Sequence, residues 1–262
     1  MRTSKIPTEL YHYTSLDIMT KLLSNIKSIE IGEPPNCHGE PYITFWASSV
    51  FYLNDHKEYS LHDDFLNSFN PIAKLNAKSV LGHPFLICFS EKKDFIPMWN
   101  MYGNRGTGVC LKFDGELLNR NIPQKKSFQE NILDKCHYTT PKNEKKPKKI
   151  RNKDLLQQER VLISSMKACA FDKPKCFSYE KEWRLMVWKN FEMKFRMSGN
   201  YTIPYTEVEI PAECIQRIIL GPCLTMDERE KAKLSIELLK QNSPYPRVRD
   251  LEITDSQTSL KL

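Results

Sequence analysis

The chain has 262 residues, of which 40% are hydrophobic and 27% charged, with 9 glycines and 16 prolines. This composition is that of an ordinary globular protein with a real hydrophobic core, and it excludes a fibrous or low-complexity chain. The sequence holds no run of eighteen apolar residues, and its first residues lack the apolar segment of a signal peptide. We therefore expect a cytoplasmic protein that makes no membrane contact.

The formal net charge of +7 is unevenly distributed. Residues 142–153, KNEKKPKKIRNK, hold seven Lys or Arg and one Glu, so this run carries +6 and the remainder about +1. The chain is thus a near-neutral protein with one basic run. Such a run is either a solvated loop or a contact for nucleic-acid phosphates. The cations that would make that contact are Lys145, Lys146, Lys148, Lys149 and Arg151.

Eight cysteines are scattered along the chain without a C-x-x-C pair, which argues against a structural zinc site and against a disulfide scaffold. Cys88 and Cys110 stand inside apolar stretches, where cysteine acts as a small hydrophobic residue. The adjacent pairs Cys37–His38 and Cys136–His137 have no second pair at zinc-like spacing. We expect a reducing compartment and no metal.

The N-terminal elements are organised around LYHYTS, residues 10–15. An apolar step ends at His12, and the following TSLDIMTKLLSNI places apolar residues at helical spacing from 16 to 26. Thr14 and Asp17 fit a capping box, which predicts a helix that starts directly after the histidine. A second short helix is predicted in EYSLHDDFLNSF, residues 58–69.

The central elements alternate between strand and short helix. A strand is predicted at 85–90 in PFLICFS, and IPMWNMYG predicts a short helix that Pro97 starts and Gly103 stops. The glycine-rich GNRGTG leads into the strand VCLKFD rather than into a helix, so it lacks the helix N-terminus of a phosphate-binding loop. We interpret it as a turn or a loop at the lip of a substrate site.

From about 115 to 153 the pattern is polar and basic, which predicts a mobile excursion. A long helix is then expected over 152–170, strands in YEKEWRLMVW, EVEI, RIILG and RVRDLEI, and a late helix in MDEREKAKLSIELLKQ. Without a repeat or a regular βαβ rhythm, the pattern predicts a single mixed α+β domain over residues 1–262.

Alternation in YEKEWR places Glu180, Glu182 and Arg184 on one face of the predicted strand. This row is either the solvated face of an edge strand or a set of paired carboxylates. In the second case Lys175, Lys181 or Arg184 supplies the positive charge. No G-x-S-x-G elbow and no nucleotide-binding glycine motif is present.

The order of these segments resembles the bacterial family of proteins of unknown function DUF2971. The matching motifs extend from about residue 8 to 222: LYHYTSLDIMTKLL, LND with Glu58, CFSEKKDFIPMWNMYGNRGTGVCLKFD, KCFSYEKEWR and IILGP. This pattern is in turn similar to the ADP-ribosyltransferase fold of the His-Tyr-Glu kind. The resemblance implies a split β-sheet core with flanking helices, and NAD as the substrate.

The same resemblance implies a catalytic set of His12, Tyr102 and Glu182. His12 would hold the ribose on the nicotinamide side of NAD, and Tyr102 would stack on the nicotinamide ring. Glu182 would bind the ribose hydroxyl and support the cation that forms as nicotinamide leaves. The implied NAD-binding residues are His12, Tyr13, Thr14, Trp99, Tyr102, Arg105 and Arg184.

The chemistry of N-glycosidic cleavage fits these residue types. An oxocarbenium-like state requires a carboxylate near the sugar, and a planar leaving group favours a flat ring, which either Tyr102 or Trp99 offers. Glu180, two residues before Glu182, is similar to the paired glutamates of arginine-modifying transferases, although a solvated side chain fits it equally well.

We therefore expect an ADP-ribosyltransferase that cleaves NAD and modifies a macromolecule, as a toxin-like or phage-defence effector. An NAD hydrolase would use the same residues. A non-catalytic module that binds nucleic acid through the basic run is the alternative from another class.

Overall fold

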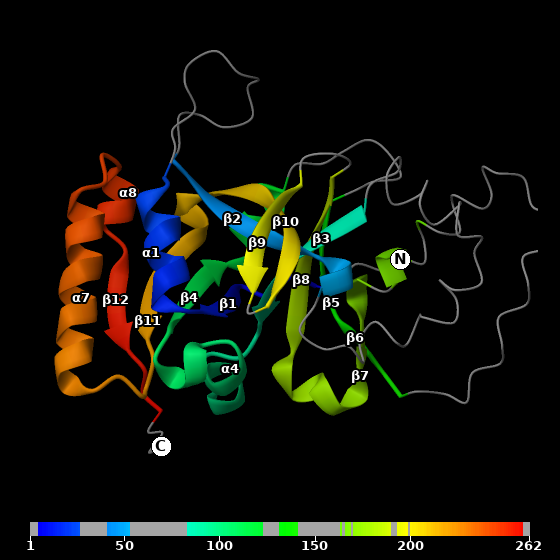
Figure 1. Ribbon diagram of the computed structural model, residues 1–262, viewed down its shortest axis with the longest axis horizontal. Helices are drawn as coiled ribbons and strands as arrows, with labels where there is room; N and C mark the ends of the chain where they lie inside the picture. The colour runs from blue at the N-terminus through cyan, green and yellow to red at the C-terminus, as the bar shows by residue number, and fades with distance from the viewer. Residues whose placement is uncertain are drawn as a thin grey trace, which may run out of the picture. The chain divides into compact units, whose positions relative to one another are not determined.

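The structure, a computed structural model, describes residues 5–26, 41–52, 83–122, 131–140, 163, 166–168, 170–189, 193–198 and 200–258. The protein is mixed α+β, with a large mixed β-sheet and few helices (Figure 1). Among the described residues, no helix has the length and apolarity needed to cross a membrane. The coarse fold class predicted from the sequence is therefore confirmed.

The chain divides into two compact units. Unit 1 consists of Met1–Ser4, Trp46–Cys88 and Pro123–Glu207, and unit 2 of Lys5–Phe45, Phe89–Ile122 and Val208–Leu262. Three strands contain residues of both units: β2 (Tyr42–Ser49), β3 (His83–Ser90) and β10 (Tyr201–Pro211). That residues 1–262 form a single domain stays a prediction.

Unit 2 contains four paired strands, in the order β12-β11-β4-β1. Their bounds are β1 Glu9–Thr14, β4 Val109–Asp114, β11 Ile215–Leu220 and β12 Glu252–Asp255. β4 is antiparallel to both β1 and β11, whereas β11 and β12 are parallel. The parallel pair is joined through two helices, as a parallel connection requires.

The helices and 3-10 turns of unit 2 follow its strands. They are α1 (Leu16–Ser24), α4 (Ile96–Met101), η2 (Asn104–Gly106), α5 (Gly115–Arg120), η4 (Ala212–Cys214), α7 (Met226–Gln241) and α8 (Pro246–Arg249). α1 and α7 pack against each other (Figure 1). A capping box between Thr225 and Glu228 starts α7.

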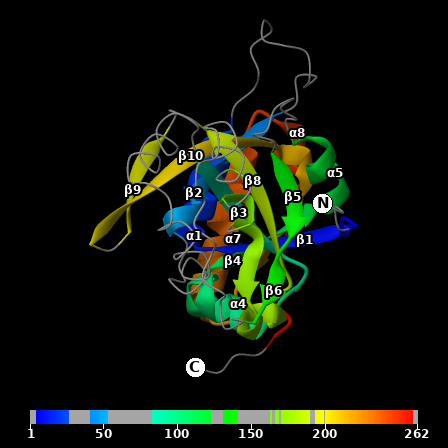
Figure 2. The same cartoon turned by 90° about the vertical axis from the view of Figure 1, so that its right-hand side faces the viewer.

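The remaining elements of the described residues belong to unit 1: η1 (Val50–Tyr52), β5 (Ile132–Lys135), β6 (His137–Thr139), β7 (Asp172–Pro174), η3 (Lys175–Glu180), β8 (Glu182–Lys189) and β9 (Lys194–Ser198). β8 lies between β3 and β5, and β6 pairs with β7 in a small parallel sheet. β9 and β10 form an extended two-stranded ribbon (Figure 2).

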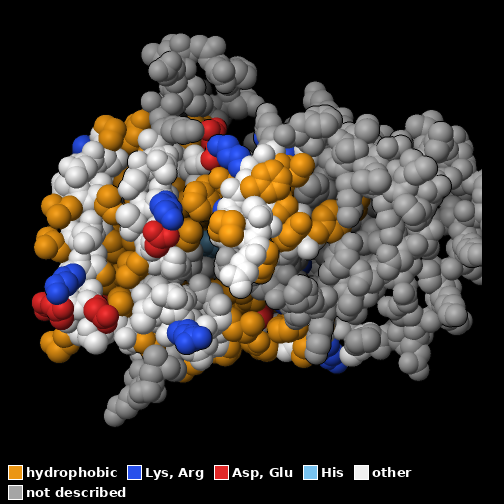
Figure 3. All heavy atoms as spheres, in the orientation of Figure 1, with side chains coloured by type: hydrophobic (Ala, Val, Ile, Leu, Met, Phe, Trp, Pro, Cys, Tyr) orange, Lys and Arg blue, Asp and Glu red, His pale blue; other side chains and the backbone are white. Residues whose placement is uncertain are grey.

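The ribbon of β9 and β10 exposes large hydrophobic side chains (Figure 3). These are Phe195, Met197 and Tyr201. β8, in contrast, is buried at every position from Glu182 to Trp188. β8 is therefore an interior strand, and the interpretation of its charged residues as a solvated edge row is wrong.

Several local predictions are confirmed. The strand in PFLICFS corresponds to β3, the helix in IPMWNMYG to α4, the strand in VCLKFD to β4, and the late helix to α7 with the predicted bounds 226–241. In the predicted helix over 152–170, the described residues Ile163, 166–168 and Ala170 are helical. The predicted helix over 58–69 and the basic run 142–153 lie outside the described residues.

Other local predictions need correction. Ser15, not Thr14, caps α1, because Thr14 still pairs with Val109 in the sheet and the Ser15 hydroxyl accepts from the Ile18 N–H. The stretch after residue 114, predicted as a mobile excursion, contains the regular elements α5, β5 and β6. RVRDLEI begins as helix α8 and becomes strand only at Glu252.

Candidate functional site

Among the described residues of unit 1, four buried charged side chains from β7, η3 and β8 lie together. We call Lys173, Glu180, Glu182 and Arg184 the charge cluster; none is more than 4% exposed. Charged side chains are almost never fully buried unless they are paired. Two cations and two carboxylates balance each other here, so the cluster as a whole is neutral.

The local backbone explains how residues close in sequence meet. Glu180 ends η3, and Lys181 adopts the left-handed conformation with φ 48° and ψ 48° before β8 begins at Glu182. This turn at Lys181 interrupts the strand, so Glu180 is not in the period-two row that the sequence predicted. Both carboxylates nevertheless contact Lys173 of β7, whose Nζ donates a hydrogen bond to each of them at a distance of 2.6 Å.

Both oxygens of the Glu182 carboxylate are engaged. Arg184 donates from Nε to Oε1 at 2.8 Å and from Nη2 to Oε2 at 3.2 Å, and Lys173 also donates to Oε2. A further Arg184 nitrogen, Nη1, donates to the Ala170 carbonyl at 2.9 Å. Charge-assisted, two-pronged bonds of this kind are the strong ones in proteins.

These contacts decide the ionisation of Glu182. Burial alone would favour the neutral acid, but the charges of Arg184 and Lys173 and their hydrogen bonds outweigh it and lower the pKa of Glu182 to about 2. Glu182 is therefore a carboxylate at every physiological pH. Its main-chain N–H also donates to the Tyr138 hydroxyl at 2.7 Å, which fixes the first residue of β8.

Two thiols, the partly buried Cys88 and the buried Cys136, lie in the electrostatic field of the charge cluster. Burial raises the pKa of Cys88 and of Cys136 well above the ordinary thiol value; the Glu182 carboxylate adds to the rise, and the charges of Arg184 and Lys173 oppose it. Thiols held protonated in this way are poor nucleophiles. Cys88 and Cys136 therefore act as packing residues.

In unit 2, the predicted aromatic residues come together. Tyr13 and Trp99 make an edge-to-face contact, with ring centroids 5.0 Å apart and planes at 87°. Tyr102, half-buried, packs against the hydrophobic cluster that contains both. We call Tyr13, Trp99 and Tyr102 the aromatic cluster. Of the three residues, Tyr102 is partly exposed, whereas Tyr13 and Trp99 are buried.

Hydrogen bonds fix Tyr13 within the aromatic cluster. Its hydroxyl donates to the Lys92 carbonyl at 2.7 Å and accepts from the Phe95 N–H at 3.0 Å. Burial raises the pKa of Tyr13 far above its ordinary value, so the phenol stays protonated. The Tyr13 hydroxyl is thus hydrogen-bonded to the loop that leads into α4.

His12 lies on the other face of β1. Its ring contacts Phe45 at 83° and Phe89 at 58°, with both centroid distances 5.8 Å. Because successive side chains of a strand alternate, His12 and Tyr13 point to opposite faces. The structure thus unites Tyr13, Trp99 and Tyr102 but does not bring His12 to them.

The other predicted site residues are placed as follows. Thr14 is buried at the end of β1, and Arg105 is exposed in η2 with φ 55°. Asn104 and Gly106 on either side also have positive φ, so GNRGTG forms a left-handed turn. No group of three His, Cys, Asp or Glu side chains suited to a metal occurs among the residues described. The basic side chains Lys145, Lys146, Lys148, Lys149 and Arg151 lie outside them.

Comparison with known proteins adds one finding. The model of the family described as "Protein of unknown function (DUF2971)" matches residues 98–185. This segment includes Trp99, Tyr102 and the whole charge cluster. No curated protein and no solved structure matches the chain.

Lys173 is the main functional candidate that the sequence pattern did not indicate. Lys175, Lys181 and Arg184 were the expected partners of the glutamates, and of these Arg184 is confirmed. Lys173 stands nine residues before Glu182, in a three-residue strand that no periodicity reveals. The one sequence signal for Lys173 as a partner of the glutamates is its positive charge, next to Asp172 and Pro174.

Proposed function

We propose that the protein cleaves the nicotinamide–ribose bond of NAD and transfers ADP-ribose to a macromolecular acceptor, with an ADP-ribosyltransferase-like fold. The observation that carries the proposal is the Glu182 carboxylate, which the charge cluster keeps ionised with a pKa of about 2. Cleavage of an N-glycosidic bond builds positive charge on the ribose, and a fixed carboxylate stabilises that charge.

The reaction requires one bond to break and one to form. The C–N bond between ribose and nicotinamide breaks, and nicotinamide leaves with the electron pair. The acceptor then donates an electron pair to the oxocarbenium-like ribose, which forms the new bond, and the acceptor loses a proton. Glu182 accepts a hydrogen bond from a ribose hydroxyl in this proposal. With water as the acceptor, the same steps give an NAD hydrolase.

The charge cluster supports this role because Glu182 can exchange a partner at low cost. Lys173 is bonded to both Glu180 and Glu182 at 2.6 Å. When Glu182 turns one oxygen to a ribose hydroxyl, Lys173 keeps Glu180 as its counter-ion, so no unpaired buried charge results. This gives Glu180 a supporting role in place of the acceptor contact that the sequence suggested as one possibility.

Tyr102 is the proposed platform for the nicotinamide ring in unit 2. It is a partly buried residue that packs against the hydrophobic cluster, whereas Trp99 is fully buried within that cluster. His12 remains a proposed ribose contact. Its ring packs against Phe45 and Phe89, on the face of β1 opposite to the aromatic cluster.

The test is nicotinamide release from NAD by the purified protein and its Glu182→Gln variant. We expect release by the wild type and a loss of at least about a hundredfold in Glu182→Gln, as for removal of one charge-stabilising group. Glu116→Gln, at an exposed position of α5, is the matched control and should keep full activity. Circular dichroism and thermal melting establish that each variant is folded.

NAD labelled in the adenylate part distinguishes the two reactions. Label on a precipitated macromolecule from cell lysate supports transfer, and free ADP-ribose alone indicates hydrolysis. If the wild type releases no nicotinamide, either alone or with lysate, the proposal is wrong.

A further inference from the structure

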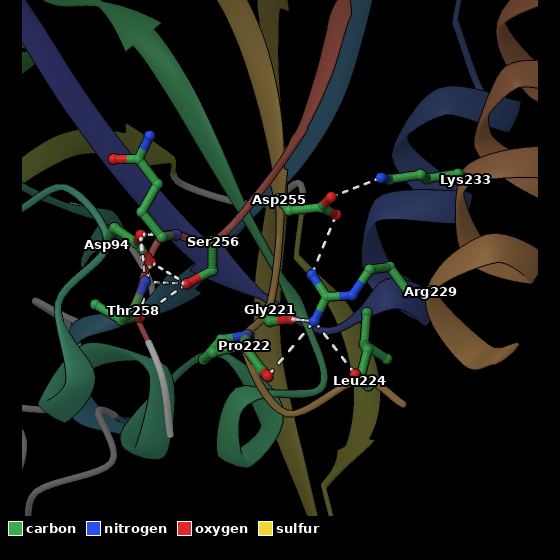
Figure 4. A network of polar contacts seen from close by, with 10 residues as sticks. Asp94, Gly221, Pro222, Leu224, Arg229, Lys233, Asp255, Ser256 and Thr258 are labelled. Atoms are coloured by element: carbon green, nitrogen blue, oxygen red, sulfur yellow. Dashed lines mark hydrogen bonds and ion pairs between the residues drawn. The ribbon is translucent and has the colours of Figure 1, made fainter. Parts of the chain in front are cut away.

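One carboxylate outside the charge cluster collects an unusual number of donors. Asp94, in the loop between β3 and α4, accepts at Oδ1 from Trp99 Nε1 (2.7 Å), Ser256 Oγ (2.5 Å) and Thr258 Oγ1 (3.1 Å). At Oδ2 it accepts from the main-chain N–H groups of Gln257 (2.5 Å) and Thr258 (3.2 Å). Figure 4 shows Asp94 meeting this segment, which follows β12. We call Ser256, Gln257 and Thr258 the strap.

The strap leaves β12 from a position that is fixed without Asp94. Asp255, the last residue of β12, pairs with Arg229 at 3.1 Å and with Lys233 at 2.6 Å, both from α7 (Figure 4). The Ser256 N–H donates to the Leu220 carbonyl at 2.9 Å. The beginning of the strap is therefore tied to β11 and α7, and only its continuation depends on Asp94.

Arg229 stabilises the turn below this anchor. Its Nη2 lies 3.2–3.5 Å from the three carbonyl oxygens that follow β11 (Figure 4). These belong to Gly221, Pro222 and Leu224. The guanidinium thus joins the turn to the end of β12, from which the strap continues to Asp94.

The other end of the contact reaches into the aromatic cluster. Trp99 is completely buried, and a buried indole N–H needs an acceptor, which Asp94 provides. The Trp99 ring contacts Tyr13, and a Cβ on Gly103 would come within 2.5 Å of its Cε3 atom. The ring therefore has little room to move while its N–H is held.

The backbone at Asp94 shows that the arrangement is imposed by its contacts. Asp94 has φ 49°, a left-handed conformation that costs a non-glycine residue free energy and persists where surrounding contacts over-determine it. Burial opposes ionisation of the Asp94 carboxyl. The hydrogen bonds from the strap and from Trp99 outweigh burial and lower the pKa of Asp94. The carboxylate is thus charged and fully used.

We propose that Asp94 is a positioning residue: its carboxylate joins the strap to the Trp99 indole, so docking of the strap sets the position of the aromatic cluster. The effect on NAD binding, through Tyr102, rests on the proposed function. The joint between strap and indole does not, and it can be tested without any activity.

The first experiment observes the indole N–H of Trp99 by NMR in protein labelled with ¹⁵N-tryptophan, assigned with Trp99→Phe. We expect Asp94→Ala to move this resonance and to speed hydrogen exchange at the Gln257 and Thr258 amides by at least about tenfold, since each loses a charged acceptor. Asp227→Asn, an exposed α7 position paired with Lys231, is the control for removal of one carboxylate and should change neither.

A second variant approaches the joint from the strap, for the case in which Asp94→Ala does not fold. Ser256→Ala combined with Thr258→Ala removes two donors from Asp94 and leaves the loop sequence intact. It should shift the same Trp99 resonance in the same direction, because both hydroxyls and the indole N–H donate to Asp94 Oδ1. An unchanged Trp99 resonance in both folded variants would overturn the proposal.

Kinetics separate this inference from the proposed function. If the wild type cleaves NAD, Ser256→Ala combined with Thr258→Ala should have a higher KM for NAD, and this rise should exceed the fall in kcat. If the wild type does not cleave NAD but the Trp99 resonance responds as expected, the joint stands and only its catalytic use is lost. Normal KM with a shifted resonance would show that the joint does not serve NAD binding.

Discussion

Glu182 and Arg184 lie two residues apart on one buried face of β8, and the Arg184 guanidinium grips both oxygens of the Glu182 carboxylate, at 2.8 and 3.2 Å. Lys173 and Glu180 complete a neutral set of four charges. Loss of one partner from such a set leaves an uncompensated buried charge, which costs far more than the pair itself contributes. Stability should therefore follow the charge balance of the cluster rather than the number of its contacts.

Lys173→Met tests that balance. It leaves two carboxylates facing one guanidinium, and we expect the free energy of unfolding to fall by about 3–5 kcal/mol. Lys173→Met combined with Glu180→Gln restores neutrality, so the double variant should lose less than the single one although it alters a second residue of the cluster. Urea denaturation at pH 7 measures both. A double variant less stable than the single would mean that charge balance is not what holds the cluster.

The pH dependence of stability should carry the signature of Glu182. Its pKa is lowered from 4.5 to about 2 in the folded protein, so its stabilising contribution is present above the unfolded pKa and is lost as the pH falls from about 5 to 2. This contribution is at most roughly 3 kcal/mol. Glu182→Gln should flatten the unfolding free energy over that window, whereas Asp17→Asn, at an exposed α1 position, should retain the wild-type decline.

The helices and strands with strong local signals could be predicted from the sequence. α7 has a cap at Thr225, acidic residues in its first turn and good helix formers throughout, and these signals need no tertiary context. The start of α1 was misplaced by one residue because both Thr14 and Ser15 can cap. The pairing of Thr14 with Val109 of β4 decides between them, and that pairing is not local.

The candidate sites show the same division. The sequence indicates Glu182, Arg184, Trp99 and Tyr102 because they stand in short, dense motifs. It could not indicate that the strap, some 162 residues after Asp94, supplies donors to that carboxylate. Nor could it separate His12 from Tyr102, since their placement on different faces of β1 depends on how α4 packs.

The contact between Tyr13 and Trp99 should appear as an energetic coupling. A double-mutant cycle with Tyr13→Leu and Trp99→Leu should give a coupling of about 0.5–1.5 kcal/mol, as for other edge-to-face pairs. A parallel cycle with His12→Leu and Trp99→Leu should be additive within about 0.5 kcal/mol, because the two rings lie on opposite faces of β1. Urea unfolding of the wild type and the five variants provides the free energies. Equal coupling in the two cycles would contradict the placement of His12.

Gly108 should tolerate no side chain. A Cβ there would lie 2.2 Å from the Thr14 carbonyl oxygen and 2.8 Å from that of Gly103, so the backbone between α4 and β4 would have to move. We expect Gly108→Ala to lower the free energy of unfolding by about 3 kcal/mol or more. Thr107→Ala, next to it, loses only a surface hydroxyl and should cost at most about 1 kcal/mol. Similar losses for the two variants would show that this close approach is absent in solution.

Tyr102 offers the sharpest test of the proposed platform, because the residue is partly exposed and its replacement should leave the fold intact. If the ring stacks on nicotinamide, Tyr102→Phe should keep KM for NAD near the wild-type value, and Tyr102→Ala should raise it by about tenfold, which corresponds to one aromatic contact. Steady-state nicotinamide release over a range of NAD concentrations measures both constants. Equal losses in Tyr102→Phe and Tyr102→Ala would assign the effect to the hydroxyl and rule out stacking. No loss in either would move the platform away from Tyr102, while a normal response to Glu182→Gln in the same assay would leave the cleavage chemistry in place.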